Sequence, residues 1–320
     1  MENGKQVRKK RIRRRRFVQG ELHHIYQRTI MGFNIFYDLE DYLVYYTIFA
    51  TAVRQYGVVI WGLCLMYDHI HMLMTAESKV MMSEFIRQVT SMFAREQNND
   101  TGRKGSLFQS RFGSASKIGL KKIRTAIAYL FNNPVEKNLC HRAEEYRWNF
   151  LAYAKSKHPF SEMISLNKAS ASLRKALKEV DICESQDRHL RYMQVRRMFG
   201  KLELDERMQL LDYVISKYNP INYEELIGCY SSYEDMLIAI NSNTGSEYDI
   251  KETRYAFSDV EYECMINVLR NVEGIKEVRQ VTGADLSEKI RLLKLLRRYV
   301  SCSNMQIAKF LHLELDDGGD

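Results

Sequence analysis

Two histidines, His69 and His71, stand in the apolar run CLMYDHIHMLM, which is β-branched enough to form a buried strand. Side chains two residues apart on a strand point to the same face of a sheet, so both imidazoles project together and Ile70 projects to the other side. Two imidazoles held side by side on a rigid strand are suitable metal ligands. This spacing also arises by chance, so an ordinary pair of core or surface histidines is the alternative until further groups join the pair.

A tyrosine and an asparagine about sixty residues later could join them. Residues 123–135 have the pattern of a helix that Pro134 stops near Asn133, because the residue before proline is disfavoured in the α region. Tyr129 and Asn133 are four residues apart and therefore share one helical face. That face would present a phenol nucleophile and an amide oxygen ligand together. The alternative is that Tyr129 is a core aromatic and Asn133 a helix cap.

These segments resemble the motifs of IS200-like single-tyrosine transposases, nearest to the REP-associated branch. LMYDHIHMLM is similar to the family's LMPNHVHLL motif, and AYLFNNPVEKNL is similar to its YIHLNPVRAGL motif. LHHIYQR, IFYD, LFQSRF and YRWNF follow the family's further motifs in the expected order. The resemblance covers about residues 17–155.

Some positions depart from the family pattern without removing a proposed chemical group. Tyr67 and Asp68 stand where the family has Pro and Asn, and Phe108 stands where it has Trp. A Lys137–Asn138 pair replaces Ala–Gly. These departures leave the activity of this copy open.

The resemblance implies a metal-dependent single-strand DNA endonuclease and strand transferase that acts on hairpin or palindromic DNA. The Tyr129 oxygen would attack phosphorus and leave a 5′-phosphotyrosine and a free 3′-hydroxyl. His69, His71 and Asn133 would hold Mg²⁺ or Mn²⁺, since the site mixes nitrogen and oxygen donors. Asp68 is excluded as a ligand, because a regular strand would point it away from the histidines.

Two other classes of function stay open. The first is a domesticated DNA-binding protein or regulator with weak or no catalysis. The second is an RNA-binding protein that uses the same kind of sheet, although the sequence offers no aromatic pair of the type found in RNA-recognition motifs. His24, in the segment that resembles the family's first strand, is expected to be a structural hydrogen-bonding residue.

Charge is concentrated at the start of the chain. Residues 1–16 hold nine Lys and Arg residues against one Glu, which equals the net charge of +8 of the whole chain. A like-charged block of this density is expected to bind polyanions such as DNA, and a solubilising tail is the alternative. The predicted DNA contacts are Arg8, Lys9, Lys10, Arg11, Arg13, Arg14, Arg15 and Arg16 in this arm, with Arg28, Arg111 and Lys117 beyond it.

Composition indicates an ordinary globular protein of two domains, with 320 residues, 45% hydrophobic and 28% charged. The sequence contains no apolar run of transmembrane length, and its six cysteines are scattered without metal-site spacing. We therefore expect a cytoplasmic protein, associated with the bacterial nucleoid when bound to DNA. No membrane partner is expected, and the chain would be a monomer or homodimer.

The periodicity predicts how these residues are positioned. Strands are expected at 22–30, 58–67, 70–76 and 107–117, and helices at 37–56, 81–96 and 120–133. This order is that of an α+β fold, a ferredoxin-like βαββαβ sheet with an added nucleophile helix. The expected divisions are a basic arm at 1–16, the transposase-like domain at 17–155 and a mainly α-helical C-terminal domain at 160–320.

The C-terminal domain carries one further pattern. Residues 285–300 should form a helix with an apolar stripe, opposite a face that includes Lys289. The stripe comprises Leu286, Ile290, Leu293, Leu296 and Val300. Residues 303–311 resemble the first helix of a helix-turn-helix, so the region near 285–313 is either a truncated unit of that kind or only an amphipathic helix.

Overall fold

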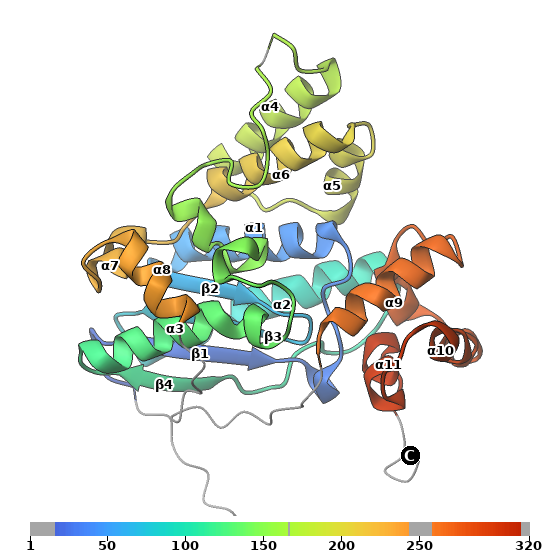
Figure 1. The fold of residues 1–320 in the computed structure, drawn as a ribbon, viewed down its shortest axis with the longest axis horizontal. Coiled ribbons are helices and arrows are strands. Elements are labelled where there is room, and N and C mark those ends of the chain that lie inside the picture. The colour runs from blue at the N-terminus through green and yellow to red at the C-terminus, as the bar shows by residue number, and fades with distance from the viewer. Residues whose placement is uncertain (1–16, 166, 243–257, 315–320) are drawn as a thin grey trace, which may run out of the picture.

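The computed structural model describes residues 17–165, 167–242 and 258–314. Its centre is a four-stranded antiparallel sheet in the order β2-β3-β1-β4 (Figure 1). The strands are β1 (Leu22–Arg28), β2 (Val59–Leu65), β3 (His69–Thr75) and β4 (Gly113–Lys117). One helix connects β1 to β2 and another connects β3 to β4, which is the ferredoxin-like βαββαβ arrangement. The predicted α+β fold class is confirmed.

Two helices, α1 (Leu39–Tyr56) and α2 (Lys79–Thr101), cover one face of the sheet. Asp38 begins α1 in a capping box with Asp41, and the Ser78 hydroxyl accepts the free N–H of Met81 in the first turn of α2. Aromatic and aliphatic side chains of both helices meet the apolar side chains of the strands. The resulting core includes Ile25, Ile70, Met72, Phe49, Phe85 and Phe93.

A third helix, α3 (Leu120–Glu136), covers the opposite face and lies in front of the sheet in Figure 1. The helix continues past Pro134, so the prediction that it ends near Asn133 was three residues short. Pro134 cannot donate a backbone hydrogen bond, but the last turn is held by Lys137 N–H to Asn133 O at 3.1 Å and Leu139 N–H to Pro134 O at 2.9 Å.

β4 is shorter than the predicted strand over 107–117. Only Gly113–Lys117 pairs continuously with β1, while Phe108 forms an isolated bridge with Thr29. Between them the chain leaves the sheet and forms one wall of an open groove against α2. The predicted strand therefore contains a loop.

Three groups of helices follow the sheet (Figure 1). The first comprises α4 (Ala171–Ser185), α5 (Tyr192–Phe199) and α6 (Leu204–Tyr218), of which α5 and α6 pack on α1 and α4 packs on both. The second comprises α7 (Tyr223–Gly228) beside β2 and α8 (Tyr233–Asn241) beside α3. The third comprises α9 (Val260–Asn271), α10 (Leu286–Tyr299) and α11 (Asn304–Leu311). One buried cluster joins α4–α6 to the sheet, and the predicted boundary between 155 and 160 stays a prediction.

Short 3-10 helices complete the described chain. They are η1 (Ile30–Gly32), η2 (Ala143–Glu145), η3 (Arg147–Asn149), η4 (Leu151–Ala154) and η5 (Val278–Gly283). None of the helices in the described ranges is long and apolar enough to cross a membrane.

The apolar stripe predicted for α10 is buried only at its C-terminal end. Leu296 and Val300 are buried as predicted, but Leu286 is 65% exposed and Ile290 is 41% exposed. Lys289, predicted on the opposite face, is buried instead. Lys289 is accommodated because its Nζ donates to the carbonyl of His312 at 3.2 Å. The buried face of α10 is therefore the one that contacts His312, just after α11.

α11 is buried from Gln306 to Leu311, and its Phe310 ring packs against Tyr37 and Tyr262. The two interpretations of 285–313, a truncated helix-turn-helix unit or an amphipathic helix, stay predictions.

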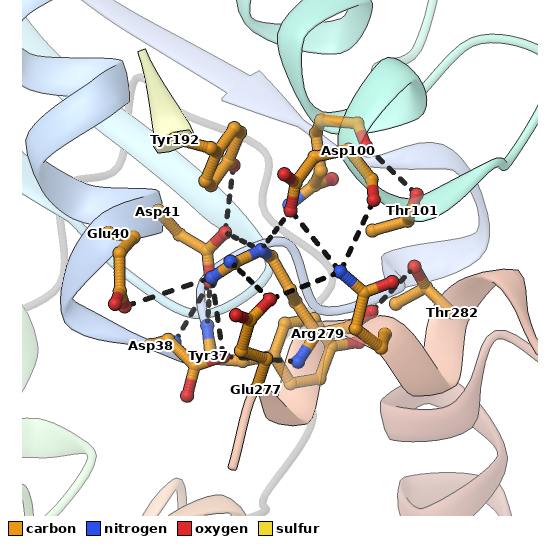
Figure 2. Close-up of polar contacts among 12 residues, drawn as sticks. Tyr37, Asp38, Glu40, Asp41, Asp100, Thr101, Tyr192, Glu277, Arg279 and Thr282 are labelled. Atoms are coloured by element: carbon orange, nitrogen blue, oxygen red, sulfur yellow. Dashed lines mark hydrogen bonds and ion pairs between the residues drawn. The ribbon is translucent and has the colours of Figure 1, made fainter. Parts of the chain in front are cut away.

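A buried arginine joins the third group of helices to the sheet. Arg279 of η5 is 0% exposed, and its guanidinium faces carboxylates of α1 and α2 (Figure 2). Its Nε lies 2.8 Å from Asp100, and Tyr192 covers its plane at 4.4 Å. We call this group the arginine cluster; it comprises Arg279, Asp38, Glu40, Asp41, Asp100, Tyr192 and Glu277.

Candidate active site

The face of the sheet under α3 carries the chemically competent residues. β1 pairs with β3 so that Tyr26 lies opposite His71 and Arg28 lies opposite His69. Directly opposite residues of an antiparallel pair point to the same face, and so does His24, two residues before Tyr26. In this register His69 and His71 lie on the same face of the sheet, as predicted.

Two glycines let the layers approach closely on this face. A Cβ at Gly62 would lie 3.1 Å from the ring of Phe131 on α3. A Cβ at Gly113 would overlap the ring of Tyr26, which lies across β4. Larger residues at these positions would lift α3 or displace Tyr26 from the histidine side of the sheet.

The three histidines form a connected group. His24 and His71 are 0% exposed, and Nε2 of His24 lies 3.0 Å from Nδ1 of His71. The rings of His69 and His71 are nearly perpendicular, with centroids 4.9 Å apart. We call these residues, together with Tyr129, the histidine cluster. His24 makes the structural hydrogen bond expected of it.

Tyr129 reaches this group from α3. Its ring centroid lies 5.6 Å from both His24 and His71, and the residue is only 4% exposed. The helix thus places a phenol beside the imidazoles of His24 and His71. Asn133, one turn later, is also buried, and its Nδ2 donates to the carbonyl of Tyr129 at 2.9 Å. This bond orients the amide and makes Oδ1 its candidate ligand atom.

Asp68 is the residue that the sequence analysis misplaced. β3 begins at His69, so Asp68 lies in the turn and does not follow the alternation of the strand. Its Oδ1 lies 2.5 Å from Nδ1 of His69, and its carbonyl accepts hydrogen bonds from the N–H and hydroxyl of Thr29. The side chain therefore faces His69, contrary to the reason for which it was excluded.

Charge around Asp68 holds its carboxylate in the ionised form. Burial alone would raise the pKa of Asp68, but the facing His69 ring, Lys309 and Lys137 together bring that pKa below its ordinary value. Lys309 comes from α11, outside the segment that carries the motifs. No local pattern around residue 309 could have indicated this contact.

The donor set fits a divalent metal. An ionised carboxylate only accepts hydrogen bonds, so Nδ1 of His69 carries the proton towards Asp68 and Nε2 is its ligand atom. The contact of His71 is different, because either Nε2 of His24 or Nδ1 of His71 can be the donor. Nε2 of His71 is a ligand atom in the tautomer in which its Nδ1 donates to His24. Within the described residues no three His, Cys, Asp or Glu side chains are grouped to hold a metal. Asn133 offers an amide oxygen as the candidate third ligand.

The predicted DNA contacts lie in different settings. Arg28 is half-buried at the end of β1, Arg111 is exposed, and Lys117 is 1% exposed at the end of β4. The eight arm residues, Arg8 to Arg16, lie outside the described residues. All of these contacts stay predictions.

Arg111 lines a groove that the sequence analysis did not anticipate. The groove has a volume of about 880 Å³, lies on the α2 side of the sheet and includes Lys79 and Arg87 on its wall. Hydroxyl side chains such as Ser83 and Thr90 alternate with these cations. The spacing of Ser83 and Arg87 on one helical face was a signal that could have found this surface.

Comparison with known proteins supports the resemblance drawn from the motifs. Residues 21–133 match the family model described as "Transposase IS200 like", so the resemblance is confirmed for that segment. No curated protein matches the chain. A solved structure of a REP-associated tyrosine transposase bound to a REP hairpin is similar at 17% sequence identity, with a TM-score of 0.37. That similarity covers 49% of this chain and 94% of the other.

Proposed function

We propose that residues 21–133, the segment that matches the IS200-like transposases, form the catalytic centre of a single-strand DNA endonuclease and strand transferase. One observation carries the proposal: the ring of Tyr129 lies 5.6 Å from the rings of both His24 and His71. A phenol held beside imidazoles on a rigid sheet is suited to phosphoryl transfer, because a neighbouring base or a bound metal can activate it as a nucleophile.

Tyr129 is the nucleophile in this proposal. Its phenolic oxygen forms a bond to the scissile phosphorus, while the bond from phosphorus to the 3′ oxygen breaks. The tyrosine loses its proton, the 3′ oxygen gains one, and the products are a 5′-phosphotyrosine and a 3′-hydroxyl. Attack by a 3′-hydroxyl on the phosphotyrosine reverses these changes and joins a new strand.

His69, His71 and Asn133 would hold the Mg²⁺ or Mn²⁺ ion that the family resemblance implies. Such an ion would stabilise the charge that develops on the phosphoryl oxygens. Asp68 accepts from Nδ1 of His69, so Nε2 of His69 would present its lone pair to the ion. Nε2 of His71 would do so when Nδ1 of His71 donates to Nε2 of His24. The amide of Asn133 is oriented by its bond to the Tyr129 carbonyl.

The proposed substrate is single-stranded DNA next to a hairpin or palindrome, as the motif resemblance implies. Arg28 lies opposite His69 and is suited to a phosphate near the reacting one. Arg111 opens onto the groove along α2 and would contact more distant phosphates. Lys117 would have to move from its buried position to make a contact of this kind.

The basic arm is proposed to contact DNA phosphates. Deleting residues 1–16 removes nine positive charges, so DNA affinity should fall and its salt dependence should flatten by roughly 0.7 in log–log slope per lost contact. Filter binding to one hairpin at several salt concentrations measures both. An unchanged slope and intercept would leave the arm as a solubilising tail.

A covalent trapping experiment tests the function. The full chain is incubated with Mn²⁺ and a library of single-stranded hairpins with randomised flanks, labelled separately at the 5′ and 3′ ends. The 3′ label should become attached to protein, and the 5′ label should appear on a free fragment ending in a 3′-hydroxyl. Peptide mapping should place the adduct on Tyr129. Hairpin binding without any adduct would favour the DNA-binding regulator instead.

A further inference from the structure

The C-terminal segment, residues 258–314, touches both sides of the candidate site. At its start, the N–H of Asp259 donates to the carbonyl of Lys137 at 3.1 Å, at the end of the helix that carries Tyr129. Near its end, α11 packs beside η1 and the β2–β3 turn, where Asn34 N–H donates to the carbonyl of Lys309 at 3.3 Å. The segment therefore connects the tyrosine helix with the turn that precedes the histidines.

The Lys309 side chain and the Asp68 carboxylate both lie against Gly32. A Cβ at Gly32 would lie 3.4 Å from Nζ of Lys309 and 3.6 Å from Oδ2 of Asp68. Gly32 also has a φ of +71°, which disfavours any residue with a side chain. The glycine thus leaves room for the ammonium and for Oδ2 of the carboxylate at the same position.

Each oxygen of Asp68 therefore faces a different partner. Oδ1 lies 2.5 Å from Nδ1 of His69, and Oδ2 is on the Lys309 side. Lys309 is only 6% exposed, and a buried ammonium is stable only beside a compensating charge. Burial lowers the pKa of Lys309, and the Asp68 carboxylate opposes that shift. Asp259 acts on Lys309 in the same direction as Asp68 does, so it is the competing partner.

We propose that Lys309 is a positioning residue of the candidate site, which acts through Asp68 to set the orientation of the His69 imidazole. The proposal rests on the proposed function, because His69 matters as a metal ligand there. Partners of ligand histidines commonly decide their tautomer and orientation. Here the chain of contacts begins on a helix far outside the matched segment, which ends at residue 133.

Five variants test the proposal. Lys309→Met removes the charge and keeps the length, and Lys309→Arg restores the charge. Lys289→Met is the matched control, since Lys289 is also a buried lysine of this segment but donates to the carbonyl of His312. Asp68→Asn and the double variant Asp68→Asn/Lys309→Met complete a thermodynamic cycle. Circular dichroism and thermal unfolding identify variants that fail to fold.

The first readout is the ring of His69 in the metal-free protein, followed by ¹⁵N-histidine NMR. Wild type, Lys309→Arg and Lys289→Met should show the proton on Nδ1 of His69 and the same ring shifts. Lys309→Met should change those shifts. Unchanged shifts in folded Lys309→Met would overturn the proposal, whether or not the protein binds metal.

The second readout is Mn²⁺ affinity by calorimetry. Asp68→Asn should weaken binding by about 10-fold, as for other partners of ligand histidines, and Lys309→Met by a smaller factor. The double variant should match Asp68→Asn alone, because Lys309 acts through Asp68. Additive losses would assign Lys309 a role through Asp259 and reject the proposed route. Absence of Mn²⁺ binding in wild type would reject the proposed metal site and leave the NMR result as the test of positioning.

Discussion

The histidine cluster and the arginine cluster are both buried and polar, yet they are built in opposite ways. The histidine cluster draws its residues from two strands and one helix of the matched segment. The arginine cluster gathers residues from α1, α2, α5 and η5, which are separated by up to 241 positions in the chain (Figure 2). One cluster belongs to a single structural unit, and the other joins several.

Their charges differ as well. Around Arg279 the carboxylates of Asp38, Asp100 and Glu277 lie 3.4, 2.8 and 3.1 Å from guanidinium nitrogens. Removing such charges from water is costly, and close pairing offsets that cost. Imidazoles can be neutral near pH 7, so the histidine cluster needs no such compensation. From this comparison we infer that the arginine cluster stabilises the packing between distant segments, whereas the histidine cluster serves the proposed catalysis.

The strongest test of this comparison is Tyr129→Phe. The change removes one oxygen, so the covalent DNA adduct should be lost completely while hairpin binding persists. Stability should fall by no more than about 1.5 kcal/mol, the usual contribution of one hydrogen bond. Trapping assays and urea unfolding on the same samples measure both effects. An adduct that persists in the variant would remove Tyr129 from the mechanism.

Replacing the ligand histidines should have the next largest effect. His69→Ala and His71→Ala should each weaken Mn²⁺ binding by at least about 100-fold, since even outer partners of such ligands contribute 10- to 100-fold. Asn133→Ala should have a smaller effect, because an amide is the weakest ligand of the three. Calorimetry measures the affinities.

His23→Ala is the matched control for these variants. His23 is also buried on β1, but it points to the other face and stacks on Phe17 at 4.9 Å. Its replacement should leave Mn²⁺ affinity unchanged. Equal affinities for wild type, His69→Ala and His71→Ala would make the histidine pair structural.

The sequence sufficed to predict the face shared by His69 and His71, because period-two alternation is a local property of a strand. The direction of a side chain in the turn before β3 was not predictable in the same way. The predicted strands, 58–67 and 70–76, left Asp68 between them, but its exclusion applied the alternation of a strand to it. The structure has Asp68 in the turn before β3, where this alternation does not hold.

Arg279→Met tests the role of the arginine cluster. Loss of one partner from a buried ion cluster leaves charges uncompensated, so unfolding free energy should fall by about 3–5 kcal/mol. Arg291→Met is the control, because Arg291 pairs with Glu273 and Glu288 at a half-exposed position, where solvent screens the charges, and its loss should change stability little. Chemical denaturation measures both. An Arg279→Met protein of wild-type stability that no longer forms the adduct would overturn the division of roles.

The contacts of the C-terminal helices could not be predicted because they depend on distant partners. α10 has leucines at 292, 293, 295 and 296, so several faces are equally apolar and periodicity does not select one. The buried face is the one on which Lys289 donates a hydrogen bond to the carbonyl of His312. Arg279 likewise stands in no local motif, and its partners Asp38 and Asp100 lie far away in sequence.

The smallest expected effect is a pH dependence of stability that arises from Asp41. Burial, only partly opposed by Arg279, raises the pKa of Asp41 from 3.8 to about 6 in the folded protein. The folded state therefore binds this proton more tightly than the unfolded state does, and the resulting stability is lost as the pH rises from about 4 to about 6. Asp41→Asn removes this contribution, so the difference in unfolding free energy between wild type and variant should change by up to about 3 kcal/mol across that window. Urea unfolding at a series of pH values measures the difference. A difference that grows in favour of wild type with rising pH would mean that attraction to Arg279 outweighs burial, and that Asp41 is a stabilising member of the arginine cluster when ionised.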